Sequence, residues 1–534
     1  KKNKDSFNKA ANLISHRGPD DSRYVEFAEL QVKFFRLSIL DLSKNGMQPM
    51  ISQNERYLMV FNGEIYNANA IKKKLLNTNF LGSSDSEVLF NLLISKGEKA
   101  VNNIEGMFSF IFFDKKTKKI IFCRDRFGIK PLYYLENDRE IIFSSEVKPI
   151  LKYKNINSIN ETIALDFFLK GSMDHSDKSI FKNVKSLLPG HYLVFKSFKP
   201  SNFCYWSIDK VKKVNAESEN YLTKNIQNHF IKSVDKHLIS DREIGLFLSG
   251  GTDSTALAYL MSQKIDYNLK TYTYGFSNDK TFSEYSVVNK TIEKLKISNT
   301  AVDIKPTDIT DNMEEIVKIL ESPFTSIRIF GMYKLYDLVK KDGLKVIIEG
   351  DGGDELFGGY DYNFLFYALD FAKKNKNPNK FNELIFKFIE LKNKKNTFED
   401  TLINYLITLT FQNGSTSDGT PYVESNNFNL NYLSKHVDES FYHEDKTPKL
   451  NYLQHSQYLD INNLKLPRSL KYKDRISMNF GIETRLPFLD HNFAQFVFKI
   501  PNNYKIKNFN TRYIFKKSIS NLTKKKNIFK KTKK

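Results

Sequence analysis

The stretch that decides the fold of the second half of the chain is Leu246-Phe247-Leu248-Ser249-Gly250-Gly251-Thr252-Asp253-Ser254-Thr255. A buried strand, Ile244 to Leu248, runs into a glycine turn, and the turn runs into a helix that includes Ala256 to Met261. Glycines let the backbone approach a phosphate closely, and a helix N-terminus offers free amides and a positive dipole end to an anion. Asp253 is a poor neighbour for phosphate unless a divalent cation lies between them, so the loop also predicts Mg²⁺.

Strands and helices alternate on both sides of this loop. The expected strands after it are Leu269 to Gly275 and Lys345 to Glu349, and the expected helices are Tyr221 to Leu238, Phe282 to Lys294 and Arg328 to Lys341. Such alternation predicts an α/β domain with a doubly wound parallel sheet. We assign this domain to residues 221–534 and interpret residues 365–460 as its helical extension.

A second loop rich in glycine and carboxylates follows the strand at Lys345 to Glu349. It reads Glu349-Gly350-Asp351-Gly352-Gly353-Asp354-Glu355 and continues to Tyr360. Acids this close repel one another unless a cation or a hydrogen-bond donor absorbs the charge. A polar surface turn is the structural alternative. The phosphate loop GxxxxGK[ST] is absent from the sequence, so the two loops do not indicate transfer of a γ-phosphoryl group.

The first 195 residues have a different, strand-rich pattern, which predicts an α+β domain of layered antiparallel sheets. One helix, Ser86 to Ser95, interrupts the strands, and turns rich in Gly, Asn and Asp separate them. Residues 196–220 are polar and are interpreted as a linker. The expected strands are Gln31 to Ile39, Tyr57 to Asn62, Met107 to Phe113, Lys119 to Cys123, Glu140 to Ser144 and His191 to Phe195.

The composition of the 534 residues indicates a globular protein of two or three domains, with 40% hydrophobic residues and a net charge of +21. The charge comes mostly from lysines spread along the chain, so we expect no nucleic-acid partner. No apolar run is long enough for a membrane span. The two cysteines form no disulfide framework, which fits a cytoplasmic location; Cys123 is expected to be a buried strand residue.

The two glycine loops resemble those of a known family. Ser-Gly-Gly-x-Asp-Ser after a strand is similar to the pyrophosphate loop of adenylating ATP pyrophosphatases, and the second loop is similar to the acidic loop of asparagine synthetases. A third stretch, Tyr472 to Asn479 with Gly481 to Asp490, resembles another signature of that family. The resemblance implies that Asp351 helps to form an acyl-adenylate and that Asp253 and Asp354 share Mg²⁺. It implies contacts to ATP or pyrophosphate from Leu248, Ser249, Gly250, Gly251, Asp253, Ser254, Tyr274, Glu349 and Gly350, although the family usually has Ser where Glu349 stands.

The N-terminal half resembles class II glutamine amidotransferases, which have an N-terminal-nucleophile fold. The likeness starts at His16-Arg17-Gly18-Pro19-Asp20 and includes Asn62-Gly63-Glu64-Ile65-Tyr66-Asn67 and Arg124 to Tyr134. By this resemblance Arg36 grips the α-carboxylate of glutamine, and Asp85 and Glu64 hold its ammonium group. The amides of Asn62 and Gly63 form an oxyanion hole. Leu37 and Ile39 complete the glutamine-binding set.

The nucleophile of that family is an N-terminal cysteine, whereas residue 1 here is Lys. We expect that a short N-terminal stretch with the cysteine precedes this sequence. The alternative is a synthetase that uses free ammonia. The C-terminus is also expected to be cut, and Lys533 is the candidate for a catalytic lysine that contacts the reacting phosphate; a solvated basic tail is the other interpretation.

These resemblances predict a glutamine-dependent enzyme that makes asparagine from aspartate through an aspartyl-adenylate, with ATP and Mg²⁺. They are compatible with a homodimer. One alternative is an amidotransferase of the same build that acts on another carboxylate, such as a modified sugar or a peptide. Another is a binding or regulatory protein that keeps the fold of a decayed enzyme; the retained Asp253, Asp351 and Asp354 speak against it.

Overall fold

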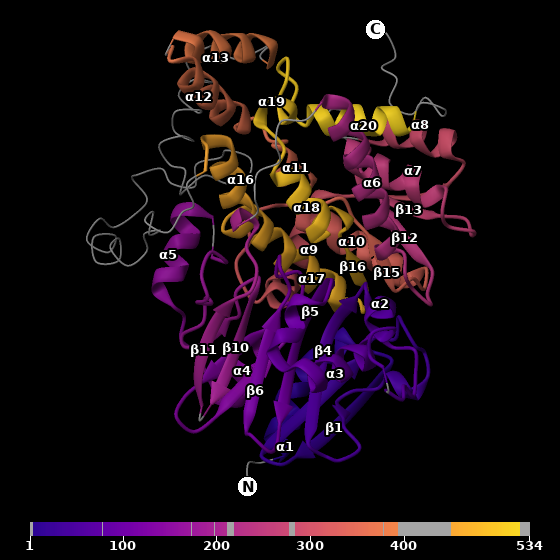
Figure 1. Ribbon diagram of the computed structural model, residues 1–534, viewed down its shortest axis with the longest axis vertical. Coiled ribbons are helices and arrows are strands. Elements are labelled where there is room, and N and C mark those ends of the chain that lie inside the picture. The colour runs from indigo at the N-terminus through magenta and orange to yellow at the C-terminus, as the bar shows by residue number, and fades with distance from the viewer. Residues whose placement is uncertain are drawn as a thin grey trace.

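The computed structural model describes residues 4–76, 78–171, 173–196, 198–210, 218–276, 284–377, 379–392 and 450–523. Figure 1 shows antiparallel strands of the first half below a second half that combines a sheet with many helices. Lys533 and the middle of the expected helical extension, 393–449, lie outside the described residues.

The first half is built on a six-stranded antiparallel sheet of order β11-β10-β6-β5-β4-β3. This confirms the predicted layered antiparallel fold. β11 falls within the segment interpreted as a linker, where it pairs with β10. The strands are β3 (Met50–Ile51), β4 (Tyr57–Ile65), β5 (Gly106–Asp114), β6 (Lys119–Arg124), β10 (His191–Lys196) and β11 (Lys199–Cys204).

Two smaller antiparallel sheets and several helices complete this half. Cys123 of β6 is buried, as expected, and Cys204 is exposed. The sheets consist of β1 (Asp21–Phe27) with β2 (Leu30–Arg36), and of β8 (Ile141–Ser144), β7 (Tyr133–Glu136) and β9 (Lys185–Ser186). The helices are α1 (Lys4–Ala11), η1 (Asn12–Arg17), η2 (Lys44–Gly46), α2 (Ala68–Lys72), α3 (Asp85–Lys96), η3 (Gly97–Asn102), α4 (Lys148–Lys154) and α5 (Glu161–Lys170).

The second half contains a parallel five-stranded sheet of order β14-β13-β12-β15-β16, which confirms the predicted α/β class. From β12 the chain builds outward to β13 and β14, and then returns to place β15 and β16 on the other side. The order therefore reverses between β12 and β15, and such a switch point is where open parallel sheets bind ligands. The strands are β12 (Ile244–Phe247), β13 (Lys270–Gly275), β14 (Ser298–Asp303), β15 (Val346–Ile348) and β16 (Glu483–Arg485).

Helices surround this sheet and extend beyond it. Of the expected helical extension, the structure describes α12 (Asn363–Asn375), α13 (Asn379–Lys392) and α16 (Tyr452–Asn462). No helix in the described ranges is both long and apolar enough to cross a membrane. The others are η4 (Ile208–Lys210), α6 (Glu219–His237), α7 (Thr252–Ser262), α8 (Tyr285–Leu295), α9 (Pro306–Leu320), α10 (Arg328–Lys341), α11 (Gly353–Phe357), α17 (Lys465–Asn479), η7 (Pro487–Leu489), α18 (His491–Phe498), α19 (Asn502–Lys505) and α20 (Tyr513–Leu522).

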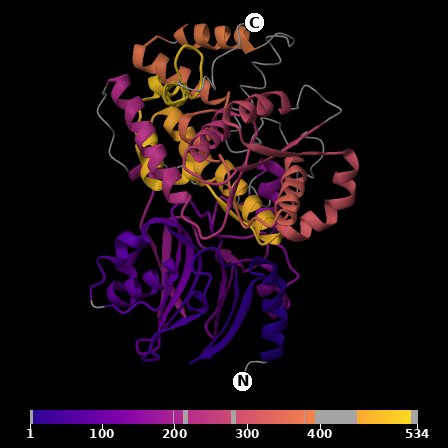
Figure 2. The same cartoon turned by 90° about the vertical axis from the view of Figure 1, so that its right-hand side faces the viewer.

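The two halves pack directly on each other (Figure 2). Ile39, Tyr66 and Met107 of the first half belong to the same buried apolar cluster as Leu246 of the second. Buried charges also cross the boundary: Arg17 donates to Asp474 of the second half at 2.8 Å, and Glu146 of the first half lies 3.5 Å from Arg475 of the second. Because buried charges are costly unless they are paired, these contacts fix how the halves are oriented.

Candidate active site

The two glycine loops lie side by side at the switch point of the parallel sheet, since β12 pairs with β15. Asp253 stands in the first turn of α7 and Asp354 in the first turn of α11. Both carboxylates converge on Arg512: its Nη1 lies 2.7 Å from Asp253 and 2.9 Å from Asp354. The structure therefore brings together the two residues that the sequence nominated for a shared cation.

The residues at this edge fit a divalent cation. Asp253 Oδ1 is buried and has no hydrogen-bond partner. Burial raises the pKa of Asp253 to about 7, against the opposing effect of Arg512. Among the described residues, no three His, Cys, Asp or Glu side chains are arranged as a metal site. Two carboxylates are nevertheless sufficient for Mg²⁺, which commonly completes its octahedron with phosphate oxygens and water.

The first loop has the geometry of an anion cradle. Gly250 adopts φ +70°, which favours glycine, and the next residues start α7 with their amides free of a side-chain cap. The hydroxyls of Ser249 and Ser254 lie 3.1 Å apart. Leu248 is buried, and its amide donates to Tyr272 at 2.9 Å, so the end of β12 is held rigidly.

The remaining predicted nucleotide contacts surround this cradle. Tyr274, at the end of β13, packs against Gly331, where an added Cβ would lie 2.8 Å from the ring. A Cβ on Gly353 would lie 2.7 Å from Asp253 Oδ2, so that glycine allows α11 to approach the carboxylate. Gly350 also lies close, with an added Cβ 3.3 Å from Asp253 Cβ. The loop after β15 is thus in contact with the loop after β12.

Asp351 and Glu349 belong to a buried polar cluster that sequence reasoning found only in part. Asp351 accepts a hydrogen bond from Ser469 at 2.7 Å, and burial raises its pKa to about 6. Lys473 pairs with Glu349 and lies 3.4 Å from Asp351. Tyr336 also donates to Glu349. Lys473 lies within the third signature stretch, whereas no motif in the sequence marked Tyr336 or Arg512.

In the first half, all seven predicted glutamine-binding residues line one cavity of about 150 Å³. The cavity lies at the end of β2 and beside β4. Asn62 Nδ2 is buried and has no hydrogen-bond partner, as expected of a donor that awaits a ligand oxygen. The wall is completed by Met478 and Glu483 from the second half of the chain. The seven residues are Arg36, Leu37, Ile39, Asn62, Gly63, Glu64 and Asp85.

The charged groups of this cavity are buried and held firmly. Arg36 donates to the backbone carbonyls of Ser43, at 2.6 Å, and Asp41. Asp85 accepts from the amides of Ile65 and Ser86, and burial still raises its pKa to about 7. Burial and the neighbouring Asp85 raise the pKa of Glu64 well above its usual range. A ligand ammonium group would favour the ionised form of both acids.

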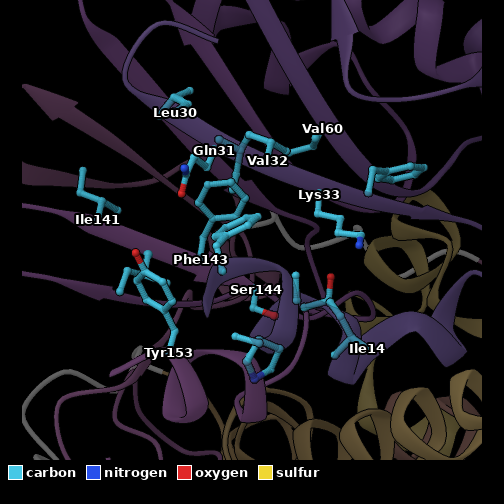
Figure 3. A pocket seen from close by; sticks show the side chains of 18 of the residues that line it. Ile14, Leu30, Gln31, Val32, Lys33, Val60, Ile141, Phe143, Ser144 and Tyr153 are labelled. Carbon is cyan, nitrogen blue, oxygen red and sulfur yellow. The ribbon is translucent and has the colours of Figure 1, made fainter. Parts of the chain in front are cut away.

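A larger cavity of about 700 Å³ adjoins the first one and shares Asn62 and Ser145 with it. Figure 3 shows Ile14, Val32, Phe143 and Tyr153 around it, and these apolar side chains come from η1, β2, β8 and α4. Neither Cys123 nor Cys204 lines either cavity.

Together these features define a class of protein: an amidotransferase-like antiparallel domain joined to a parallel-sheet domain with a pyrophosphate-type loop. Comparison with family models agrees. Residues 225–534 match the asparagine synthase family, and residues 1–206 match the glutamine amidotransferase domain. The chain belongs to the asparagine synthase family.

The relatives differ in what their names describe. The chain is 31% identical to asparagine synthetase [glutamine-hydrolyzing] 2 of Bacillus subtilis, over 96% of the chain and 66% of that protein. It is 29% identical to asparagine synthetase [glutamine-hydrolyzing] 1 of the same organism, over 95% of the chain and 79% of that protein. It is 26% identical to amidase chyE of Penicillium rubens, over 96% of the chain and 82% of that protein.

Proposed function

We propose that this protein is a glutamine-dependent asparagine synthetase, which converts ATP, aspartate and glutamine to asparagine, AMP, diphosphate and glutamate. The observation that carries the proposal is the convergence of Asp253 and Asp354 at the head of two helices, beside a glycine cradle. Glycine loops at helix N-termini bind phosphate groups, and the paired acids supply ligands for the cation that accompanies them.

The proposed synthetase reaction has two steps. A carboxylate oxygen of aspartate attacks the α-phosphorus of ATP, and the bond from that phosphorus to the diphosphate breaks. The nitrogen of ammonia then attacks the acyl carbon, the bond to AMP breaks, and the nitrogen loses a proton. The cradle of Ser249 to Ser254 holds the diphosphate and Asp351 orients the acceptor. Asp253 and Asp354 would hold Mg²⁺, which would supply positive charge to neutralise the phosphates.

In the amidotransferase half, Arg36 fixes the carboxylate of glutamine, while Glu64 and Asp85 hold its ammonium group. The unpartnered amide of Asn62 and the amide of Gly63 stabilise the oxyanion of the tetrahedral intermediate. Glutamine hydrolysis also needs a nucleophile beside Asn62. Cys123 and Cys204 do not line the cavity, so neither is assigned this role.

The test measures pyrophosphate release and amide formation by the full chain with ATP, Mg²⁺ and aspartate. Ammonium chloride and glutamine are supplied in separate reactions. Synthesis with ammonium supports the adenylating site, and synthesis with glutamine supports the complete reaction. No pyrophosphate release with aspartate from either donor would reject aspartate as the acceptor.

A second candidate is an amidotransferase of the same build with another carboxylate acceptor. The buried pair of Glu349 and Lys473 favours it, because this pair lies against Asp351 at the place where an acceptor would bind. The similarity to amidase chyE, whose name describes a different activity, also supports it. Pyrophosphate release that depends on a peptide or sugar carboxylate, and not on aspartate, would select this candidate.

A further inference from the structure

The short strand β16 touches both candidate sites at once. It pairs in parallel with β15, so that Ile348 lies opposite Arg485. Figure 1 shows it next to β15 at the side of the parallel sheet that faces the strand-rich half. Its three residues are buried, although all three are polar or charged. Buried polar groups need partners, and the partners of β16 lie in two different places.

The alternation of side chains along a strand explains this division, because successive residues point to opposite faces. Glu483 and Arg485 point toward the first half. Arg485 Nη2 lies 3.1 Å from Glu64 Oε2 in the glutamine cavity, and its Nε lies 2.9 Å from Glu483. Lys130 approaches Glu483 at 3.4 Å. Charged residues of the second half therefore close one end of the cavity in the first half.

Thr484 points the other way, into the second half. Its Oγ1 lies 2.6 Å from the hydroxyl of Tyr336, which donates to the Glu349 carboxylate. The backbone of β16 reaches the same residue, because the Glu349 amide donates to the Arg485 carbonyl at 3.0 Å. Glu349 is the first residue of the loop that carries Asp351. One three-residue strand thus connects the cavity at Glu64 to the acidic loop.

The charged groups around Glu64 make this connection sensitive to a ligand in the glutamine cavity. Without a ligand, Glu64 has one carboxylate oxygen bound to Arg485 and one buried oxygen without a partner. An ammonium group beside Glu64 and Asp85 would compete with Arg485 for the Glu64 carboxylate. The guanidinium also donates to the carbonyl of His237 at 3.0 Å, which restricts its rotation.

We propose that β16 couples the two sites, with Arg485 and Thr484 as positioning residues that link occupancy of the glutamine cavity to the loop beginning at Glu349. This proposal rests on the proposed function, since it takes glutamine and a nucleotide as the two ligands. Coupling of this kind is reciprocal: each ligand changes the affinity for the other by the same factor.

The experiment titrates the full chain with glutamine by calorimetry, with and without Mg²⁺ and α,β-methylene-ATP, and then reverses the order. We expect the dissociation constant of glutamine to change by at least about fivefold when the nucleotide is present, and the reverse titration to give the same factor. Thr484→Val removes the link to Tyr336 but touches neither ligand. It should leave glutamine affinity without nucleotide unchanged and reduce the coupling factor to below about twofold.

Arg485→Lys should also reduce the factor, because lysine lacks the guanidinium fork. The matched control is Tyr66→Phe: Tyr66 is buried near Arg485, but its hydroxyl has no hydrogen-bond partner, so the factor should stay at the parent value. Binding of both ligands without coupling, or unchanged coupling in Thr484→Val, overturns this proposal alone. Failure of the parent chain to bind glutamine overturns the glutamine site of the proposed function, and the coupling proposal with it.

Discussion

The glutamine cavity and the nucleotide edge both contain a pair of acids near an arginine, yet they are built in opposite ways. In the cavity, Glu64 is 3% exposed and its partner Arg485 is fully buried. At the nucleotide edge, the Asp354 side chain is 37% exposed and Arg512 is 18% exposed. In the cavity, Glu64 lies on β4 and Asp85 begins α3, whereas at the edge Asp253 and Asp354 lie in the first turns of α7 and α11.

The two sites differ in how their charged side chains are shielded from solvent. In the closed cavity, charged side chains that are already in place would hold a small ligand. The binding free energy of that ligand therefore depends on burial and on the residues that the second half of the chain contributes. The open edge receives a ligand that brings its own counter-ion; Asp354 is partly exposed there, whereas Asp253 is largely buried and has one carboxylate oxygen without a hydrogen-bond partner. Mutations of residues that would contact a ligand at one site should therefore change mainly the binding or turnover measured at that site.

The largest expected effect comes from breaking the nucleotide edge. Asp253→Asn removes one of the two proposed cation ligands, and we expect pyrophosphate release with ammonium and aspartate to fall by about 10²- to 10³-fold. Glutamine affinity, measured by calorimetry without nucleotide, should not change, because Asp253 does not line the cavity. A decrease of less than about tenfold would contradict the assigned role.

A smaller effect is expected from pH in the glutamine cavity. Burial raises the pKa of Asp85 to about 7, so below that pH the acid is protonated and cannot pair with an ammonium group. Glutamine affinity should rise with pH between 6 and 7, by up to about tenfold per unit for one linked proton, and any further rise above pH 7 would come from Glu64, whose pKa is also raised. Calorimetry across pH 5.5–8.5 measures this.

Asp85→Asn serves as the control for that pH profile. It should bind glutamine weakly at every pH and lose the portion of the dependence that Asp85 supplies. A parent profile that is flat from pH 6 to 8 would show that Asp85 does not gate binding.

The smallest effect is expected at the partly exposed rim between the halves. Lys236 lies 2.8 Å from Glu105 of the first half and 2.8 Å from Asp490 of the second, with its side chain 25% exposed. The Glu105 carboxylate is partly exposed, and the buried Asp490 keeps the amides of Asn492 and Phe493 as donors, so Lys236→Met should lower the free energy of unfolding by about 1 kcal/mol. Urea denaturation measures this. A decrease in the free energy of unfolding as large as that caused by an Arg485 variant would contradict the proposed difference between rim contacts and buried contacts.

The fold and most of the candidate site could be predicted because their signals are local. A strand, a glycine turn and a helix head follow one another at Ile244 to Met261, and the same succession appears at Lys345 to Phe357. The seven residues proposed for glutamine were found in the same way, from short stretches on or beside β2, β4 and α3. β2 and β4 belong to different sheets, so the common cavity of these residues depends on tertiary packing.

The sequence by itself determined the strands, the glycine turns and the carboxylates, because each depends on residues within a few positions of one another. Which cationic side chains contact those carboxylates depends only on the tertiary structure. Arg512 reaches Asp253 across 259 positions, and Arg485 reaches Glu64 across 421. β16 has three polar residues and no apolar alternation, so its strand form depends on pairing with β15 and on buried partners that only the folded chain supplies.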